Sequence, residues 1–208
     1  ADFKNVHFVT SGSNDREVSR SKELPHIVEH AVASTSGDRW HTGYNGHEQI
    51  NQKGVPAGFE IFDVEGSKIK WRHISDKCDS KPFRVYDMAK VGEYYRENLD
   101  IQNLVRNYQK TIINYAAPEF AKFIYVNWWG DDPGAKLEVF EDNKPLRVRQ
   151  IWQADPQFVV TSTAVTLKHS RNKPRFGRNN CPHLYRVQRT SSTSTIRIKA
   201  TTPFGEVY

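Results

Sequence analysis

The chain has 208 residues, and its 30 Lys and Arg against 24 Asp and Glu give a formal net charge of +6. Apolar residues at 37% and charged residues at 26% are typical of a folded protein and exclude a disordered one. No run approaches the roughly 18 apolar residues of a membrane-spanning helix, so we expect no membrane span. The length suits one domain with a smaller second part.

The first third of the chain predicts β-strands. Residues 6–10 form a β-rich run that ends at the turn-forming residues 11–15, which predicts a strand followed by a loop. Residues 27–33 predict another strand, and the Gly, Ser and Thr content of residues 34–43 predicts a loop after it. Alternating runs at 58–64 and 69–74 flank Gly66, where a tight turn favours a positive φ, so we expect a hairpin there.

The remainder predicts helices and then strands. Apolar residues recur at three- and four-residue spacings over residues 87–111, which predicts one or two amphipathic helices and is the only clear helical stretch. Six strand-like segments follow, at residues 123–129, 135–140, 145–152, 158–167, 183–188 and 195–201. Short strands at this spacing favour a β-sandwich of immunoglobulin or fibronectin type, so the chain is predicted to be mainly β.

The two cysteines and the late basic residues leave alternatives open. Cys78 and Cys181 are too far apart in sequence for a C-x-x-C motif or a zinc knuckle; we favour buried or unpaired thiols, with a disulfide as the alternative. Basic residues are densest at 168–178, a segment predicted to be a solvated loop. The alternative is an anion-binding loop for an acidic glycan or another polymer; its candidate residues are Arg171, Lys173, Arg175 and Arg178. Nucleic acid is not expected, because no recognition motif accompanies the charge.

Tryptophans and histidines supply further candidates. Trp128, Trp129 and Trp152 could stack on a sugar, and neighbours on a strand face opposite ways, so we expect one of the pair in the core and the other exposed or packed on a neighbour. Trp129 is the binding candidate. Four histidines fall within residues 26–47, but their spacings fit no compact ligand motif, so no metal site is predicted.

Several short motifs occur in the order of a known family. Glu29-His30 with Trp40 is similar to "E-H-x-x-G-x-x-x-G-x-W-W-x-G", and residues 53–59 to "D-G-x-P-x-G-Y". Asn127 and Asp155-Pro156 match later "N-V-W" and "D-P" positions. Residues 182–186 match a histidine-led strand, and residues 202–208 match "D-x-F-G-x-x-Y" with Thr202 in place of Asp. The chain thus resembles the C-terminal part of bacterial calcineurin-like phosphoesterases.

The resemblance implies an architecture and a location. Residues 1–87 would be the closing strands of an incomplete metallophosphoesterase domain, residues 88–118 a helical connector and residues 119–208 a C-terminal β-sandwich. A complete family enzyme hydrolyses phosphoesters with two divalent metal ions. The family also implies export to the periplasm or cell surface.

The same resemblance predicts that this chain is inactive alone. The family's last ligand motif, G-H-x-H, should fall at residues 11–15, where Ser13 and Asp15 replace the two histidines. A serine hydroxyl is a poor ligand, and one carboxylate does not make a two-metal site. Asp15 and His30 are candidates to line the cleft, with a hydrogen-bonded structural histidine as the alternative for His30. A phosphoester substrate would need a catalytic half upstream. The alternative function is a sandwich module that binds an acidic glycan or another anionic polymer.

Overall fold

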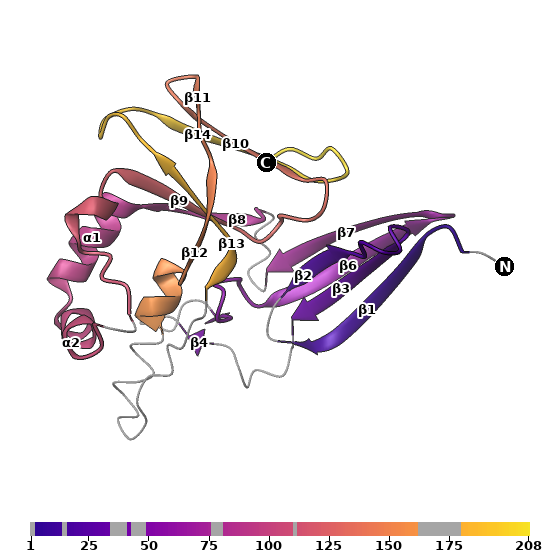
Figure 1. Cartoon of the computed structure of the whole chain (residues 1–208), viewed down its shortest axis with the longest axis horizontal. Coiled ribbons are helices and arrows are strands. Elements are labelled where there is room, and N and C mark those ends of the chain that lie inside the picture. The colour runs from indigo at the N-terminus through magenta and orange to yellow at the C-terminus, as the bar shows by residue number, and fades with distance from the viewer. Residues whose placement is uncertain are drawn as a thin grey trace.

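The computed structural model describes residues 3–13, 16–33, 41–42, 49–75, 81–109, 112–161 and 180–208. The described chain is mainly β, with strands at both ends and helices in between. Figure 1 shows the N-terminal strands on one side of the molecule and the C-terminal sheets with the helices on the other.

The N-terminal part begins with a three-stranded sheet. Strand β1 (Val6–Ser13) runs parallel to β3 (Ile27–Ala33), and β2 (Glu17–Arg20) lies antiparallel on the other side of β3. The prediction of β3 is confirmed. The predicted end of the first strand at Thr10 is wrong, because β1 resumes its pairing with β3 at Ser13 after a register shift. Pairing with a neighbouring strand outweighs the turn-forming composition of residues 11–13.

The predicted hairpin is confirmed. Strands β6 (Gly58–Glu65) and β7 (Lys68–Ser75) pair in register along their whole length, and Gly66 has a φ of 59°. Trp71 and His73 are buried while the intervening Arg72 is exposed, as alternation along a strand requires. The Trp71 ring packs edge-on to the His30 ring of β3, 4.7 Å between centroids, so the hairpin covers one face of the first sheet.

A short pair of strands lies between these elements. Strand β4 (His41–Thr42) pairs with β5 (Gln49–Ile50). The loop predicted at residues 34–43 lies largely outside the described residues.

Two further sheets form the C-terminal part. Strand β10 (Lys136–Glu141) lies between β11 (Lys144–Leu146) and β14 (Ile196–Thr201). The second sheet has the order β12 (Arg149–Gln153), β13 (Cys181–Gln188), β9 (Phe123–Trp128) and β8 (Phe83–Asp87). Ile124 and Val187 of this sheet pack against Val139 of the other. The two sheets therefore enclose an apolar core, and the predictions of β9, β10, β13 and β14 are confirmed.

Two of the predicted strands are wrong. The segment predicted at residues 145–152 is two strands, β11 and β12, which belong to different sheets because the chain crosses from one to the other at residues 147–148. Residues 156–161 are helical, although a strand was predicted from Phe158. Asp155 caps this helix through a bond from the Phe158 amide, and Pro156 suits its first turn, so the cap outweighs the β-branched Val159-Val160 pair. Residues 162–167 lie outside the described part.

The predicted helices are confirmed as a pair. Helix α1 (Met88–Glu97) is capped by Asp87, and Asn98 caps α2 (Leu99–Asn107); a 3-10 turn η1 (Pro118–Phe120) follows. Tyr95 and Leu104 pack with Tyr125 of β9, so the helices cover the sheet face that is turned away from β10 and β14. No helix in the described part of the chain has the length and apolar character to cross a bilayer.

The boundaries predicted for the three parts of the chain, residues 1–87, 88–118 and 119–208, stay a prediction. Strand β8 pairs with β9 from Phe83 to Asp87, which favours placing the start of the C-terminal part before Phe83 rather than after Asp87. The helices predicted as a connector at residues 88–118 pack on that part's own sheet.

Candidate functional site

A buried guanidinium joins the two parts of the molecule. Arg16, which lies next to the start of β2, is 6% exposed. It donates through Nη1 and Nη2 to both carboxylate oxygens of Asp132, at 2.9 Å each. It also donates to the Glu60 carboxylate of β6 and to the Trp129 carbonyl. One side chain therefore bonds to the hairpin and to the loop after β9.

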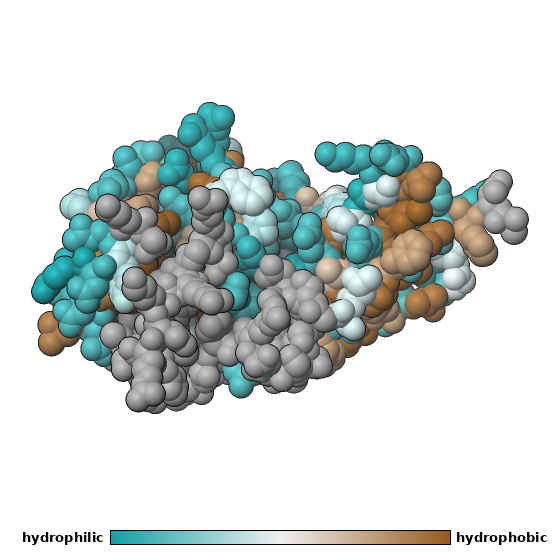
Figure 2. Space-filling view, turned by 60° about the horizontal axis from the view of Figure 1, so that its bottom comes forward, coloured by the Kyte–Doolittle hydropathy of each residue, from teal (hydrophilic) through white to brown (hydrophobic). Residues whose placement is uncertain are grey.

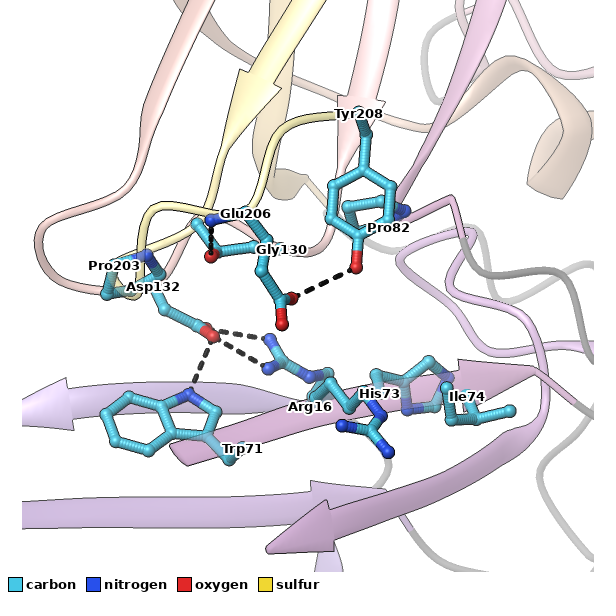
Figure 3. Close-up of a pocket in the computed structure, with 12 residues that line it drawn as sticks. Arg16, Trp71, His73, Ile74, Pro82, Gly130, Asp132, Pro203, Glu206 and Tyr208 are labelled. Carbon is cyan, nitrogen blue, oxygen red and sulfur yellow. Dashed lines mark hydrogen bonds and ion pairs between the residues drawn. The ribbon is translucent and has the colours of Figure 1, made fainter. Parts of the chain in front are cut away.

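The surrounding groups complete this first cluster. Trp71 Nε1 donates to Asp132 at 2.8 Å (Figure 3). His73 Nδ1 lies 3.3 Å from Glu60. Burial lowers the pKa of Arg16, but the charges of Asp132 and Glu60 reverse this and raise it. Burial likewise raises the pKa of Glu60, yet the charge of Arg16 and the bond from His73 bring it down to about 2. Arg16 and Glu60 are therefore ionised at neutral pH.

A cavity of about 270 Å³ lies beside this cluster. The C-terminal tail forms its far wall in Figure 3, where the Tyr208 hydroxyl donates to Glu206 at 3.3 Å. Phe204 of the same tail packs edge-on to Trp71, 4.6 Å between ring centroids. Several polar groups that line the cavity bond to one another, among them Arg16 with Asp132 and Tyr208 with Glu206.

A second buried cluster is centred on Asp155, which is fully buried. Its Oδ2 accepts from the Tyr86 hydroxyl and from Asn127 Nδ2, both at 2.7 Å, and its Oδ1 accepts from the Phe158 amide at 2.9 Å. Asn127 Nδ2 also donates to the Lys53 carbonyl at 2.8 Å. Both carboxylate oxygens are thus bonded within the protein.

The second cluster contains the residue types of a cysteine nucleophile site. His183 Nδ1 donates to Asn127 Oδ1 at 2.6 Å, and Cys181 Sγ lies 3.2 Å from the same nitrogen. Burial, with the charge of Arg16, lowers the pKa of His183 to about 3, so the ring is neutral. Cys181 is fully buried, and its Sγ also donates to Asn127 Oδ1 at 3.7 Å, so these three side chains form one buried hydrogen-bonded group.

The turn at Gly54 fits directly into this cluster. Gly54 has a φ of 77°, and a Cβ there would lie 2.4 Å from Asp155 Cγ and 2.7 Å from Asn127 Nδ2. Arg84 of β8 donates to the Gly54 carbonyl at 2.8 Å and lies over the Trp129 ring at 5.5 Å. The turn between β5 and β6 is therefore held in the C-terminal part by its backbone.

His30 lies within the fold. It is 1% exposed, and its Nε2 lies 2.8 Å from His7 Nδ1. Asn5 Oδ1 accepts from His7 Nε2 at 3.1 Å, so neutral His7 accepts at Nδ1 and His30 donates from Nε2. Burial, and the repulsion that would arise if both rings were protonated, lower the pKa of His30 to about 4. Of the two alternatives for His30, a cleft-lining residue or a hydrogen-bonded structural histidine, this geometry favours the second.

The remaining predicted residues are not brought together. Trp128 and Trp129 are both buried, and Trp129 packs on Arg84, as expected of one ring in the core and the other packed on a neighbour. Sugar binding by Trp129 stays a prediction. Trp152 is 64% exposed. Trp128 of β9 lies in the core, where it packs with Val126 and Ala200. Outside the described residues lie Asp15, Arg171, Lys173, Arg175, Arg178 and Cys78.

The comparisons with known proteins identify the family. The sequence model described as the C terminal of calcineurin-like phosphoesterase matches residues 29–208. The chain belongs to this family. The resemblance predicted from the motifs is therefore confirmed. Neither the curated proteins nor the solved structures contain a significant match.

The motifs of this phosphoesterase family converge in the fold. Gly54, Asn127, Asp155 and His183 come from four separate motifs and meet in the second cluster. Within the described residues, no three or more His, Cys, Asp or Glu side chains form a group that could hold a metal. The Nδ1 atom of His30 is buried without a partner, but Trp71 and Phe62 pack edge-on to that ring. The described donor set does not fit a two-metal centre.

The departure from the family motif at Thr202 has a measurable effect. Thr202 Oγ1 accepts from the amides of Phe204 and Glu206, at 3.3 and 3.1 Å. A carboxylate accepts such bonds more strongly, so Thr202→Asp is expected to raise the free energy of unfolding by about 0.5 kcal/mol. Thr202→Val, which keeps the shape, should lower it by about 1 kcal/mol. Urea unfolding measures both, and a Thr202→Asp variant less stable than wild type would contradict the assigned role.

Proposed function

We propose that this chain is the C-terminal, non-catalytic portion of a calcineurin-like phosphohydrolase. Its role is to hold the closing strands of the phosphoesterase domain against a β-sandwich of immunoglobulin or fibronectin type. The observation that supports this is the use of the motif residues Gly54, Asn127 and Asp155 in a buried joint. Asn127 donates to Asp155 and to the Lys53 carbonyl, and Gly54 packs against both side chains. Groups committed in this way are not available to a substrate.

Exposed apolar side chains of the N-terminal sheet favour a larger assembly. Parallel strands such as β1 and β3 normally occur in sheets that are covered on both faces. Here Phe8 and Val9 of β1 are 53% and 54% exposed, and Leu24 and Phe59 are also exposed. Figure 2 shows apolar side chains gathered over this end of the molecule. In the proposed enzyme a catalytic portion covers this surface.

The complete enzyme would supply what this chain does not. The two divalent metal ions and the phosphoester substrate belong to its catalytic portion. The family resemblance also supports a bacterial origin and export to the periplasm or cell surface.

The proposal predicts no hydrolysis by this chain. Incubation of the folded chain with bis-p-nitrophenyl phosphate and Mn²⁺ should release p-nitrophenol no faster than buffer with Mn²⁺. Cooperative urea unfolding of the same sample shows that the protein assayed is folded. Turnover that EDTA abolishes and Mn²⁺ restores would overturn the proposal.

A further inference from the structure

Cationic side chains gather around Phe123 at one end of the four-stranded sheet. Arg149 of β12 stands directly opposite Arg186 of β13 in the antiparallel register. The guanidinium carbon of Arg186 lies 4.9 Å from the centre of the Phe123 ring, and Lys122 Nζ lies 5.4 Å from it. Like charges on directly opposed residues destabilise a sheet, so an arrangement of this kind needs a compensating interaction.

Arg186 is held in place by an aromatic side chain. Its guanidinium carbon lies 4.9 Å from the centre of the Phe123 ring, and Tyr125, its partner in the register of β13 and β9, donates to Gln153 Oε1 at 3.0 Å. A guanidinium has five N–H donors in a planar fork, and stacking on a ring uses none of them. The side chain is therefore oriented before any ligand arrives.

No carboxylate of the described residues neutralises these cations. Within the part of the chain that the structure describes, Arg149, Arg186 and Lys122 take part in no ion pair. Arg189, only three residues after Arg186, is paired with Asp87 at 3.1 Å. Arg149 and Lys122 are exposed and Arg186 is half-buried, so a ligand in solvent can reach the three side chains.

Protection of the sheet edge explains only part of this cluster. Charged side chains on an edge strand discourage another strand from pairing with it, which accounts for Arg149 on β12. Arg186 lies on the inner strand β13, and Lys122 precedes the inner strand β9, where no such protection is needed.

We propose that Arg149, Arg186 and Lys122 bind a tetrahedral oxyanion, a phosphate or a sulfate group. Guanidinium forks match the oxygen geometry of these groups, and the bound anion relieves the repulsion between the opposed arginines. The site shares no residue with the two buried clusters, so it does not depend on whether the chain hydrolyses phosphoesters.

Calorimetric titration at constant ionic strength tests the site, with sodium phosphate, sodium sulfate and dextran sulfate as probes. Arg149→Gln should weaken binding about tenfold or more, because a charge-assisted bond is lost. The Arg149 side chain is exposed and makes no hydrogen bond or ion pair in the described part, so this variant is expected to fold normally. Arg186→Gln should weaken binding at least as much.

Arg197 provides a matched control. It lies 4.2 Å over the Phe140 ring in the other sheet. Arg197→Gln therefore removes the same charge and the same type of ring contact as Arg186→Gln. Its affinity for each probe should equal that of wild type. Saturable binding of free phosphate or sulfate that depends on Arg149 indicates a small-ion site, and Arg149-dependent binding of dextran sulfate alone indicates an anionic polymer. Either result supports the proposal; no binding, or an equal loss in Arg197→Gln, overturns it.

Discussion

Gly54→Ala should lower the free energy of unfolding by about 3 kcal/mol. About 1 kcal/mol comes from the positive φ of 77°, which a residue with a Cβ adopts only under strain. The rest comes from overpacking, typically 1–3 kcal/mol, because the added methyl would lie 2.4 Å from Asp155 Cγ. Asp155 cannot move aside without losing its bonds from Tyr86, Asn127 and the Phe158 amide.

Gly66 separates the two contributions. It also has a positive φ, 59°, but nothing lies within 4 Å of a Cβ placed there. Gly66→Ala therefore carries only the backbone strain, and we expect a loss of about 1 kcal/mol. Urea unfolding of both variants measures the difference. Equal losses would mean that the Gly54 turn does not press against Asp155. The main observation for a buried joint at this turn would then be contradicted.

The elements that the sequence predicts well are those specified by neighbouring residues. The β6–β7 hairpin depends on alternation and on one glycine at the turn, and α1 and α2 on apolar spacing with Asp87 and Asn98 as caps. Each of these signals lies within a few residues of its effect. The same holds for β3, whose apolar run coincides with the strand.

The elements that the sequence misses depend on distant partners. Nothing local separates β11 from β12, because the division exists only where the chain changes sheets. At Asp155-Pro156 a local cap signal is present, but the β-branched residues after it suggested a strand.

The candidate site divides in the same way. Gly54, Asn127 and Asp155 are marked by family motifs, so the sequence finds the residues but not their convergence. Arg16 and Asp132 carry no such mark, and 116 residues separate them. A common charged residue becomes informative only when it is buried, and burial of Arg16 follows from the packing of the hairpin against the C-terminal part. The one sequence signal near this pair was the Trp128-Trp129-Gly-Asp131 segment, which directly precedes Asp132.

Arg16→Gln should lower the free energy of unfolding by about 3–5 kcal/mol, the cost of breaking a buried ion pair by removal of one partner. The variant leaves the Asp132 and Glu60 carboxylates buried without their cation. It also removes the donor to the Trp129 carbonyl. Urea unfolding followed by tryptophan fluorescence is a suitable measurement, because Trp71 and Trp129 both contact the network.

Arg72→Gln is the matched control for this variant. Arg72 pairs with Asp63 at 2.9 Å, the same distance as Arg16 to Asp132, but the side chains are 43% and 57% exposed rather than 3% and 7%. Exposed pairs contribute about 0–1 kcal/mol, so we expect little change. A similar loss in both variants would show that burial does not determine the strength of the Arg16 network.

A double variant distinguishes a joint from a local contact. Asp132→Asn keeps an oxygen that can accept from Trp71, so in the Arg16→Gln background it removes one of the two unpaired charges and should recover at least 1 kcal/mol. Because Arg16 bonds to both parts of the molecule, its loss should also weaken their coupling, and the unfolding transition of Arg16→Gln should broaden or divide. A single sharp transition with a loss below about 1 kcal/mol would mean that the apolar contacts, such as Phe204 on Trp71, hold the two parts together without the ionic network.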